Sequence, residues 1–183
     1  MKASAGRVHL IQLRETPRQR WRNDGGWTRE LLALPGPDDW RVRVSVADIE
    51  SDGPFSSFPG VQRFFCVLEG TGVELTIDGK SMRITPAADA VQFAGEATTI
   101  CRMLDGPTRD LNLMVRAPRG AMQRVVAGSA WNPAAASCGL FTMAAGICRT
   151  DDATLTVPAF ALLWFERSPA ALTFDSDGWW LAA

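Results

Sequence analysis

The sequence is poor in the groups that most enzymes use for proton transfer and metal binding. Its 183 residues include one histidine, His9, and no tyrosine. A histidine cluster around a metal ion is therefore impossible within one chain, and a Ser-His-Asp or Cys-His group would have to recruit His9. The carboxylates are scattered, without a D-x-D-x-D run. We expect no metal and no cofactor, and we assign His9 to an edge or surface position.

Close cysteine pairs and long apolar runs are also missing. The four cysteines form neither a C-x-x-C motif nor a zinc framework. No apolar run approaches the roughly 20 residues of a membrane span, and "MKASAGRVHLIQL" has no signal-peptide core. Lysine and arginine total 19 and aspartate and glutamate total 20, so no net charge indicates a nucleic-acid or membrane partner. We expect a cytoplasmic protein with reduced thiols.

What the sequence has in abundance is short segments of alternating apolar and polar residues, which are typical of half-buried strands. The segment 40–46 is one, and 64–68 is a continuous apolar run that predicts a central strand. In 73–84 the Asp78-Gly79 pair predicts the tight turn of a β-hairpin. Further strands are expected at 30–34, 90–94, 98–104, 111–115, 139–145, 153–158, 160–165, 170–174 and 179–182.

This many short strands at even spacing predicts an all-β sandwich or barrel. A short helix is expected at 119–126. The stretch "RAPRG" at 116–120 resembles a junction, so we expect a longer first half and a shorter second half.

Polar residues stand out against this apolar background in three segments. In "WRNDGGWTRE", at 21–30, a flexible turn leads to Arg29 and Glu30, which are either solvated or part of a loop that closes over a ligand. In "RDLNLMVR", alternation places Asn112 on one strand face with Met114. Asn112 is then either an edge residue satisfied by water or a residue that points into a cavity.

The third segment, "SDGPFSSFPGVQRFF", carries Phe55 and Phe58 between two turn dipeptides and ends near Arg63. An arginine on an inward face needs a partner, because an unpaired buried charge costs several kcal/mol. Glu69 or Glu30 supplies an ion pair in one interpretation. In the other, Arg63 is held ready for a ligand carboxylate.

Together these stretches resemble the HutD/Ves family of bacterial proteins. The resemblance covers residues 20–118 and rests on the ordered motifs W-x-N-x-x-G-x-T-R-E, D-G-P-F-S-x-F-P-G-x-x-R, L-E-G-x-G and D-x-N-x-M. It implies a cupin fold, a jelly-roll β-barrel, built as a compact bicupin with halves at 1–118 and 119–183. Asp24 stands where the family has a small residue, and aspartate tolerates left-handed turns. The metal-binding cupin pattern G-x5-H-x-H-x3,4-E is absent from this sequence.

The resemblance also implies a role linked to histidine utilisation or, in other members, to stress or cold response. The implied partner is a small carboxylate metabolite of the urocanate or N-formylglutamate type. Carried over residue by residue, the motifs imply these ligand-binding positions: Arg63, Asn112, Arg29, Glu30, Phe55, Phe58 and Trp21.

Three functions are compatible with these features, and we favour a non-enzymatic small-carboxylate binding or regulatory protein. The second is a metal-independent cupin isomerase or hydrolase, which would need Glu30 or Glu69 for proton transfer. Such an enzyme is expected to show a carboxylic acid with a raised pKa in an apolar niche beside the arginine. The third is a stress-associated interaction module that forms a homodimer through Trp131 and the Trp179-Trp180 pair.

Overall fold

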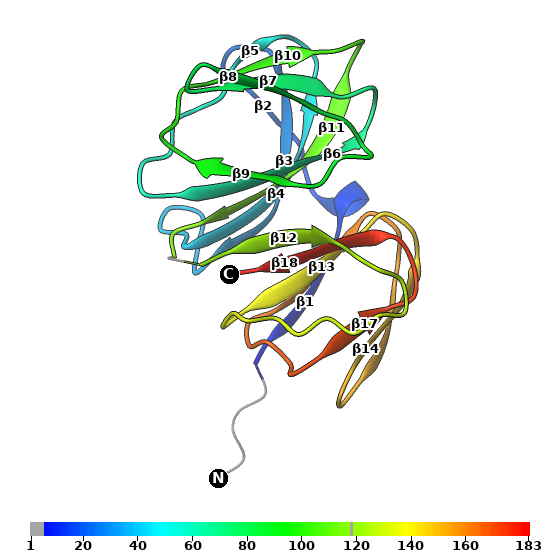
Figure 1. Cartoon of the computed structure of the whole chain (residues 1–183). Helices are drawn as coiled ribbons and strands as arrows, with labels where there is room; N and C mark the ends of the chain where they lie inside the picture. Colours follow the sequence, from blue (N-terminus) through cyan, green and yellow to red (C-terminus); the bar gives the residue numbers. More distant parts are fainter. Residues whose placement is uncertain (1–5, 118) are drawn as a thin grey trace. The chain divides into compact units, whose positions relative to one another are not determined.

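The computed structural model describes residues 6–117 and 119–183, and strands make up nearly all of its regular structure (Figure 1). The chain forms two units, one at 16–117 and one that joins 6–15 to 119–183. The predicted first half, 1–118, is therefore corrected at its start. Strand β1, Val8–Gln12, pairs antiparallel with β16, Ala161–Phe165, because the alternating N-terminal segment completes the edge of that sheet. No helix within the described ranges is long and apolar enough to cross a membrane.

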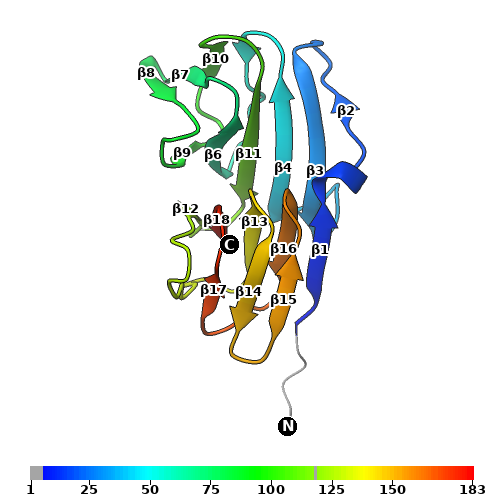
Figure 2. The ribbon, with the colours of Figure 1, turned by 90° about the vertical axis from the view of Figure 1, so that its right-hand side faces the viewer.

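The unit at 16–117 contains two antiparallel sheets, which lie face to face in Figure 1. The six-stranded sheet has the order β2-β3-β4-β11-β6-β9, and Figure 2 shows β3, β4 and β11 side by side. Its strands are β2 (Gln19–Arg20), β3 (Gly26–Leu34), β4 (Val42–Ile49), β6 (Gln62–Glu69), β9 (Val91–Ala94) and β11 (Thr108–Val115). The four-stranded sheet, β5-β10-β7-β8, consists of β5 (Gly53–Pro54), β7 (Val73–Ile77), β8 (Lys80–Ile84) and β10 (Thr99–Met103).

Turn chemistry predicted from the sequence is confirmed in this unit. Strands β7 and β8 form the expected hairpin, with Ile77 opposite Lys80. Asp78 and Gly79 have φ angles of 46° and 80°, as a tight turn with two left-handed residues requires. Asp24 also has a positive φ, 56°, which fits the tolerance of aspartate for that conformation.

Side chains from both sheets fill the space between them. Phe65 and Val67 of β6 and Leu75 of β7 are at most 1% exposed and belong to one apolar cluster. Since alternate residues of a strand point to one face, each strand contributes every second residue to this interior. Polar residues at the same alternate positions also point into this apolar interior. The candidate site therefore lies between the two sheets.

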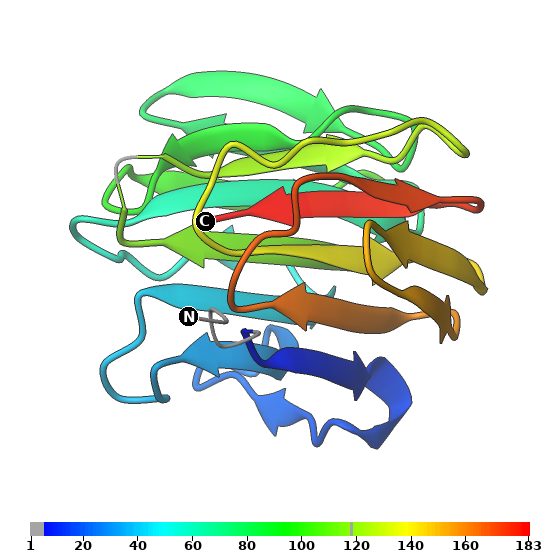
Figure 3. The same cartoon turned by 90° about the horizontal axis from the view of Figure 1, so that it is seen from below.

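The unit formed by 6–15 and 119–183 also has two sheets. Its five-stranded sheet has the order β1-β16-β13-β18-β12, and Figure 3 shows β18, β13, β16 and β1 in red, yellow, orange and blue. The three-stranded sheet has the order β15-β14-β17. The remaining elements of this unit are η1 (Leu13–Glu15), β12 (Ala121–Arg124), β13 (Cys138–Thr142), β14 (Gly146–Thr150), β15 (Thr154–Val157), β17 (Leu172–Phe174) and β18 (Gly178–Ala182).

The helix expected at 119–126 is wrong. Residues of β12 pair with β18 instead, with Met122 opposite Leu181. An isolated helix this short is marginal in water, whereas the edge of β18 offers backbone hydrogen bonds and a buried position for Met122. Strand β14 was not predicted at all.

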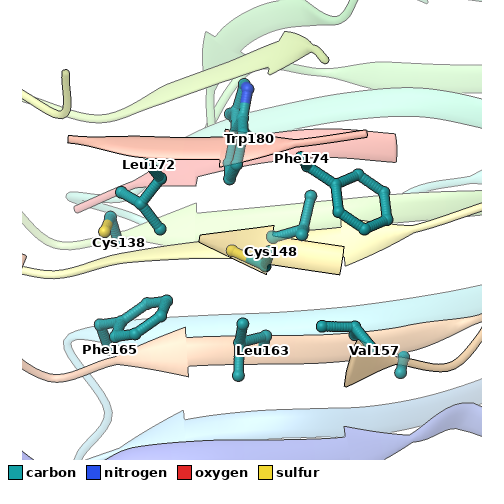
Figure 4. Close-up of a cluster of buried hydrophobic side chains, with 10 residues drawn as sticks. Cys138, Cys148, Val157, Leu163, Phe165, Leu172, Phe174 and Trp180 are labelled. Carbon is teal, nitrogen blue, oxygen red and sulfur yellow. The ribbon is translucent and has the colours of Figure 1, made fainter. Parts of the chain in front are cut away.

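The core of this second unit contains a cluster of buried hydrophobic side chains (Figure 4). Burial raises the pKa of the Cys138 thiol to about 11 and that of Cys148 to about 12, so both are neutral core residues. Trp131 stacks on Trp180 with ring centroids 4.9 Å apart. Trp179 and Trp180 are 1% and 2% exposed, so both are core residues of this unit.

Candidate functional site

Strand register assigns the candidate residues to the two faces of the six-stranded sheet. Asn112 of β11 lies opposite Ser45 of β4 and Phe65 of β6. Residues paired in this way point to the same side, and Phe65 belongs to the core between the sheets. Arg63 precedes Phe65 by two residues, so Arg63 and Asn112 both point inward.

Arg63 is a buried cation among aromatic rings. Its side chain is 5% exposed, and its Nη2 donates a hydrogen bond to Asn112 Oδ1 at 2.8 Å. Its guanidinium carbon lies 4.7, 5.2 and 6.0 Å from the ring centroids of Phe55, Phe93 and Phe58. Its Nε atom has no hydrogen-bond partner. One amide oxygen and three ring faces therefore surround the charge.

Neither of the glutamates considered as partners pairs with Arg63. Glu30 accepts a hydrogen bond from Arg43 Nε at 2.6 Å. Glu69 accepts one from Arg109 Nη1 at 2.5 Å, because an irregularity in the pairing of β11 with β6 places it opposite Arg109. Over residues 6–117 and 119–183, no carboxylate forms an ion pair with Arg63.

Asp110 is the acidic residue that acts electrostatically on Arg63. It was not among the predicted ligand-binding residues. Asp110 is 1% exposed; its Oδ1 accepts a hydrogen bond from Asn112 Nδ2, and its Oδ2 has no partner. Burial raises the pKa of the Asp110 carboxyl to about 8, against the opposing effects of Arg63 and of the bond from Asn112. Burial also lowers the pKa of Arg63 to about 10. Near neutral pH, Arg63 is charged and the Asp110 carboxyl is mostly protonated.

A signal for Asp110 was present in the sequence. The D-x-N-x-M motif spaces Asp110, Asn112 and Met114 two residues apart, which places them on one face of a strand. The predicted strand began at 111, whereas β11 begins at Thr108, so Asp110 lay just outside the predicted strand.

The structure also brings the predicted aromatic residues to this interior. Phe55 and Phe58 come from the segment between β5 and β6, and both are half-buried. Phe55 packs on Phe65 with ring centroids 5.8 Å apart. Trp21 packs against the same apolar cluster, and its Nε1 donates to Thr28 Oγ1 at 2.7 Å.

The structure separates Arg29 from this group. Arg29 lies opposite Val46 on the other face of the sheet, and its Nη1 donates to Asp48 Oδ2 at 2.9 Å. Asp48 also accepts a hydrogen bond from Arg109 at 2.6 Å. Glu30 is on the inner side, opposite Ser45, together with its partner Arg43. Arg43 lowers the pKa of Arg63 by repulsion, so two guanidinium groups share this face.

The unit at 16–117 also contains a hollow. It has a volume of about 460 Å³ and is lined by Gly60, Val61, Gln62, Gln92, Phe93, Ala94, Glu96 and Ala117. Arg63 is not among these residues, and its neighbour Gln62 points to the opposite face of β6. Within the part of the chain that the structure describes, no group of three His, Cys, Asp or Glu side chains could hold a metal ion.

Sequence comparisons identify relatives of the chain. A family model described as HutD matches residues 13–182. An uncharacterized 21.2 kDa protein in the hutC 3′ region of Pseudomonas putida is 40% identical over 109 residues, which span 58% of this chain and only 57% of that protein. Protein Ves of Cronobacter sakazakii is 29% identical over 172 residues, covering 93% of this chain and 94% of that protein.

Solved structures similar to this chain include a HutD protein and a cupin protein. A conserved protein of unknown function from Pseudomonas aeruginosa PAO1 is 30% identical, with a TM-score of 0.84 over 97% of this chain and 100% of that one. HutD from Pseudomonas fluorescens SBW25 is 26% identical, with a TM-score of 0.82 over 96% and 97%. A cupin 2 conserved barrel domain protein from Leptotrichia buccalis, 10% identical over 99% and 97%, has a TM-score of 0.56. The fold is therefore that of the all-β cupin proteins.

Proposed function

The chain belongs to the HutD family, and on that premise we propose that it is a non-enzymatic protein that binds a small carboxylate metabolite beside Arg63. The observation that carries this proposal is the guanidinium of Arg63, which is buried among three phenylalanine rings. Among the described residues, the amide oxygen of Asn112 is the one side-chain acceptor that it has.

The energetic argument is that a buried charge is stable only when it is compensated. Removing a guanidinium from water costs several kcal/mol unless a counter-charge and hydrogen bonds replace the water. Asn112 supplies a dipole but no charge, and the Nε–H of Arg63 is unused. A carboxylate supplies both missing elements, since a guanidinium binds its two oxygens with parallel N–H donors. The phenylalanine rings offer an apolar wall for the rest of the ligand.

The family supports the chemical class of the ligand. The Pseudomonas putida relative takes its name from the hutC region, which is consistent with a role in histidine utilisation. Urocanate and N-formylglutamate, small anions of that pathway, are therefore the first ligands to test. The Pseudomonas fluorescens HutD structure was solved in a formate condition, so formate is a suitable minimal carboxylate for competition.

The test is isothermal titration calorimetry at low salt with urocanate, N-formylglutamate and glutamate. We expect saturable binding to one of these by the wild type. Arg63→Met is expected to weaken it by about 10- to 150-fold, because hydrogen bonds to charged groups contribute about 1.5–3 kcal/mol. The matched control is Arg29→Met, which makes the same chemical change on the other face of the sheet and should bind like the wild type. Undiminished binding by a folded Arg63→Met variant would overturn the proposal.

A second candidate function is a metal-independent isomerase or hydrolase, and Asp110 is the observation that favours it. Asp110 is a buried carboxylic acid with a raised pKa, linked to Arg63 through Asn112, as expected of a general acid in an enzyme. A turnover assay on the compound that binds separates the two functions. Product formation by the wild type that disappears in Asp110→Asn would replace the binding function with an enzymatic one.

A further inference from the structure

We infer that Asp110 acts as an internal, proton-controlled competitor for Arg63, so that the site binds an anion when Asp110 is neutral and releases it when Asp110 ionises. This inference rests on the proposed function, because it requires that an anion binds at Arg63. It adds the regulation of that site, and it gives a role to a residue that was not among the predicted ligand-binding positions.

The geometry is a relay of three side chains. Asn112 donates to Asp110 through Nδ2 and accepts from Arg63 through Oδ1. Its amide therefore has one orientation, with its donor toward the acid and its acceptor toward the cation. All three residues are at most 5% exposed, so water screens the interaction between the two end groups only weakly.

Each end of the relay has one buried atom without a partner. At one end this is Nε of Arg63, and at the other it is Oδ2 of Asp110. Buried polar atoms are nearly always paired, so two exceptions in one network call for an explanation. An anion at Nε would supply the missing partner of Arg63, and a proton on Oδ2 would remove the negative charge from the unpartnered oxygen of Asp110.

Charged and titratable groups on the surrounding strands act on Asp110 in opposite directions. Arg63 of β6 favours its ionised form, while burial and the repulsion of Asp48 of β4 favour its neutral form. Cys101 of β10 stays a neutral thiol, because burial and the nearby Asp110 raise its pKa to about 12. Arg43 of β4 acts on Arg63 by repulsion and is itself paired with a glutamate.

The two protonation states of Asp110 therefore give two different sites. With Asp110 neutral, the relay carries one uncompensated positive charge, which attracts an anion. With Asp110 ionised, the relay is electrically neutral and Arg63 already has its counter-charge. By linkage, a bound anion must in turn favour the protonated form of Asp110. Above the pKa of the free protein, each anion that binds brings one proton from solvent onto Oδ2 of Asp110.

Formate is the probe for the test, since its own charge does not change between pH 6 and pH 9. Binding is followed by the ¹⁵N chemical shifts of Arg63 Nε and of the Asn112 side-chain amide in the full chain. For the wild type we expect a Kd that is constant below about pH 7 and that rises above about pH 8, approaching tenfold per pH unit. Asp110→Asn, which is neutral at every pH, should keep the low-pH Kd throughout. The control Asp48→Asn removes a carboxylate on the other face and should keep a rising Kd.

Three results would overturn the inference. They are a wild-type Kd that does not change with pH, an unchanged pH dependence in Asp110→Asn, and an Asp110 pKa that does not rise on adding formate. The pKa of Asp110 is measured from the ¹³C shift of its carboxyl group in the wild type. This measurement therefore tests the inference even if the Asp110→Asn variant fails to fold. The absence of any formate-induced shift at every pH would overturn the proposed function as well, whereas pH-independent binding would overturn the role of Asp110 alone.

Discussion

Replacing Arg63 with methionine should change the stability of the protein very little, although Arg63 is buried at the centre of the candidate site. Methionine fills much of the same volume and makes favourable sulfur contacts with the ring faces of Phe55, Phe58 and Phe93. The change removes the charge without opening a large cavity. The result therefore measures whether the charge stabilises the fold or is kept for another reason.

The expected change in the free energy of unfolding is the difference between two similar quantities, the cost of burying the charge and the cost of losing the contacts of Arg63. Burial lowers the pKa of Arg63 to about 10, two to three pKa units below a solvated guanidinium. At about 1.4 kcal/mol per pKa unit, the charge costs the folded state roughly 3 kcal/mol. Removing Arg63 leaves Asn112 Oδ1 unpaired, which costs about 1–3 kcal/mol, and it also removes the cation–π contacts. We expect the free energy of unfolding to change by no more than about 1 kcal/mol.

Urea denaturation at pH 7 measures this change, with Arg29→Met as the control for loss of one arginine from a partly exposed ion pair. A structural ion pair would behave differently, since removing one member of a buried pair destabilises proteins by about 3–5 kcal/mol. A loss of that size in Arg63→Met, with an unchanged m-value, would refute the argument and assign Arg63 a structural role.

Three further predictions concern stability. Because the pKa of Asp110 is raised, the folded state holds a proton that the unfolded chain releases near pH 4. The contribution of Asp110 to the free energy of unfolding should therefore fall between about pH 4 and pH 8, by up to about 1.4 kcal/mol per pH unit. Urea denaturation of Asp110→Asn over the same range should show this fall removed. Gly72 has a φ of 113°, and a Cβ there would clash with a backbone carbonyl, whereas Gly79 has a φ of 80° and open space. Gly72→Ala should therefore lower the thermal unfolding midpoint well beyond Gly79→Ala, which should cost only about 1 kcal/mol; equal losses would contradict this. Phe174→Ala should cost about 3–5 kcal/mol in chemical denaturation, because Phe174 is fully buried, and a loss below about 1 kcal/mol would show that the core of the second unit is loosely packed.

Features that depend on neighbours along the chain could be predicted from the sequence. The Asp78-Gly79 turn has the left-handed angles that its chemistry predicts, because turn geometry depends on the conformations open to two residues. The shared face of Arg63 and Phe65 follows from the period of two residues in a strand. The motifs also identified the HutD family, since they preserve residue types in a fixed order.

Which side chains contact one another could not be predicted in this way, because it depends on how the strands pair. An irregularity in the pairing of β11 with β6 placed Glu69 opposite Arg109, with which it forms a hydrogen bond. One-residue changes of register are not visible in the alternation of the sequence. Strand pairing also placed Arg29 opposite Val46, on the face away from Arg63. The protonation of Asp110 depends on burial by strands that are distant in the sequence. Register and desolvation arise from contacts between segments far apart in the chain, so the order of residues alone does not contain them.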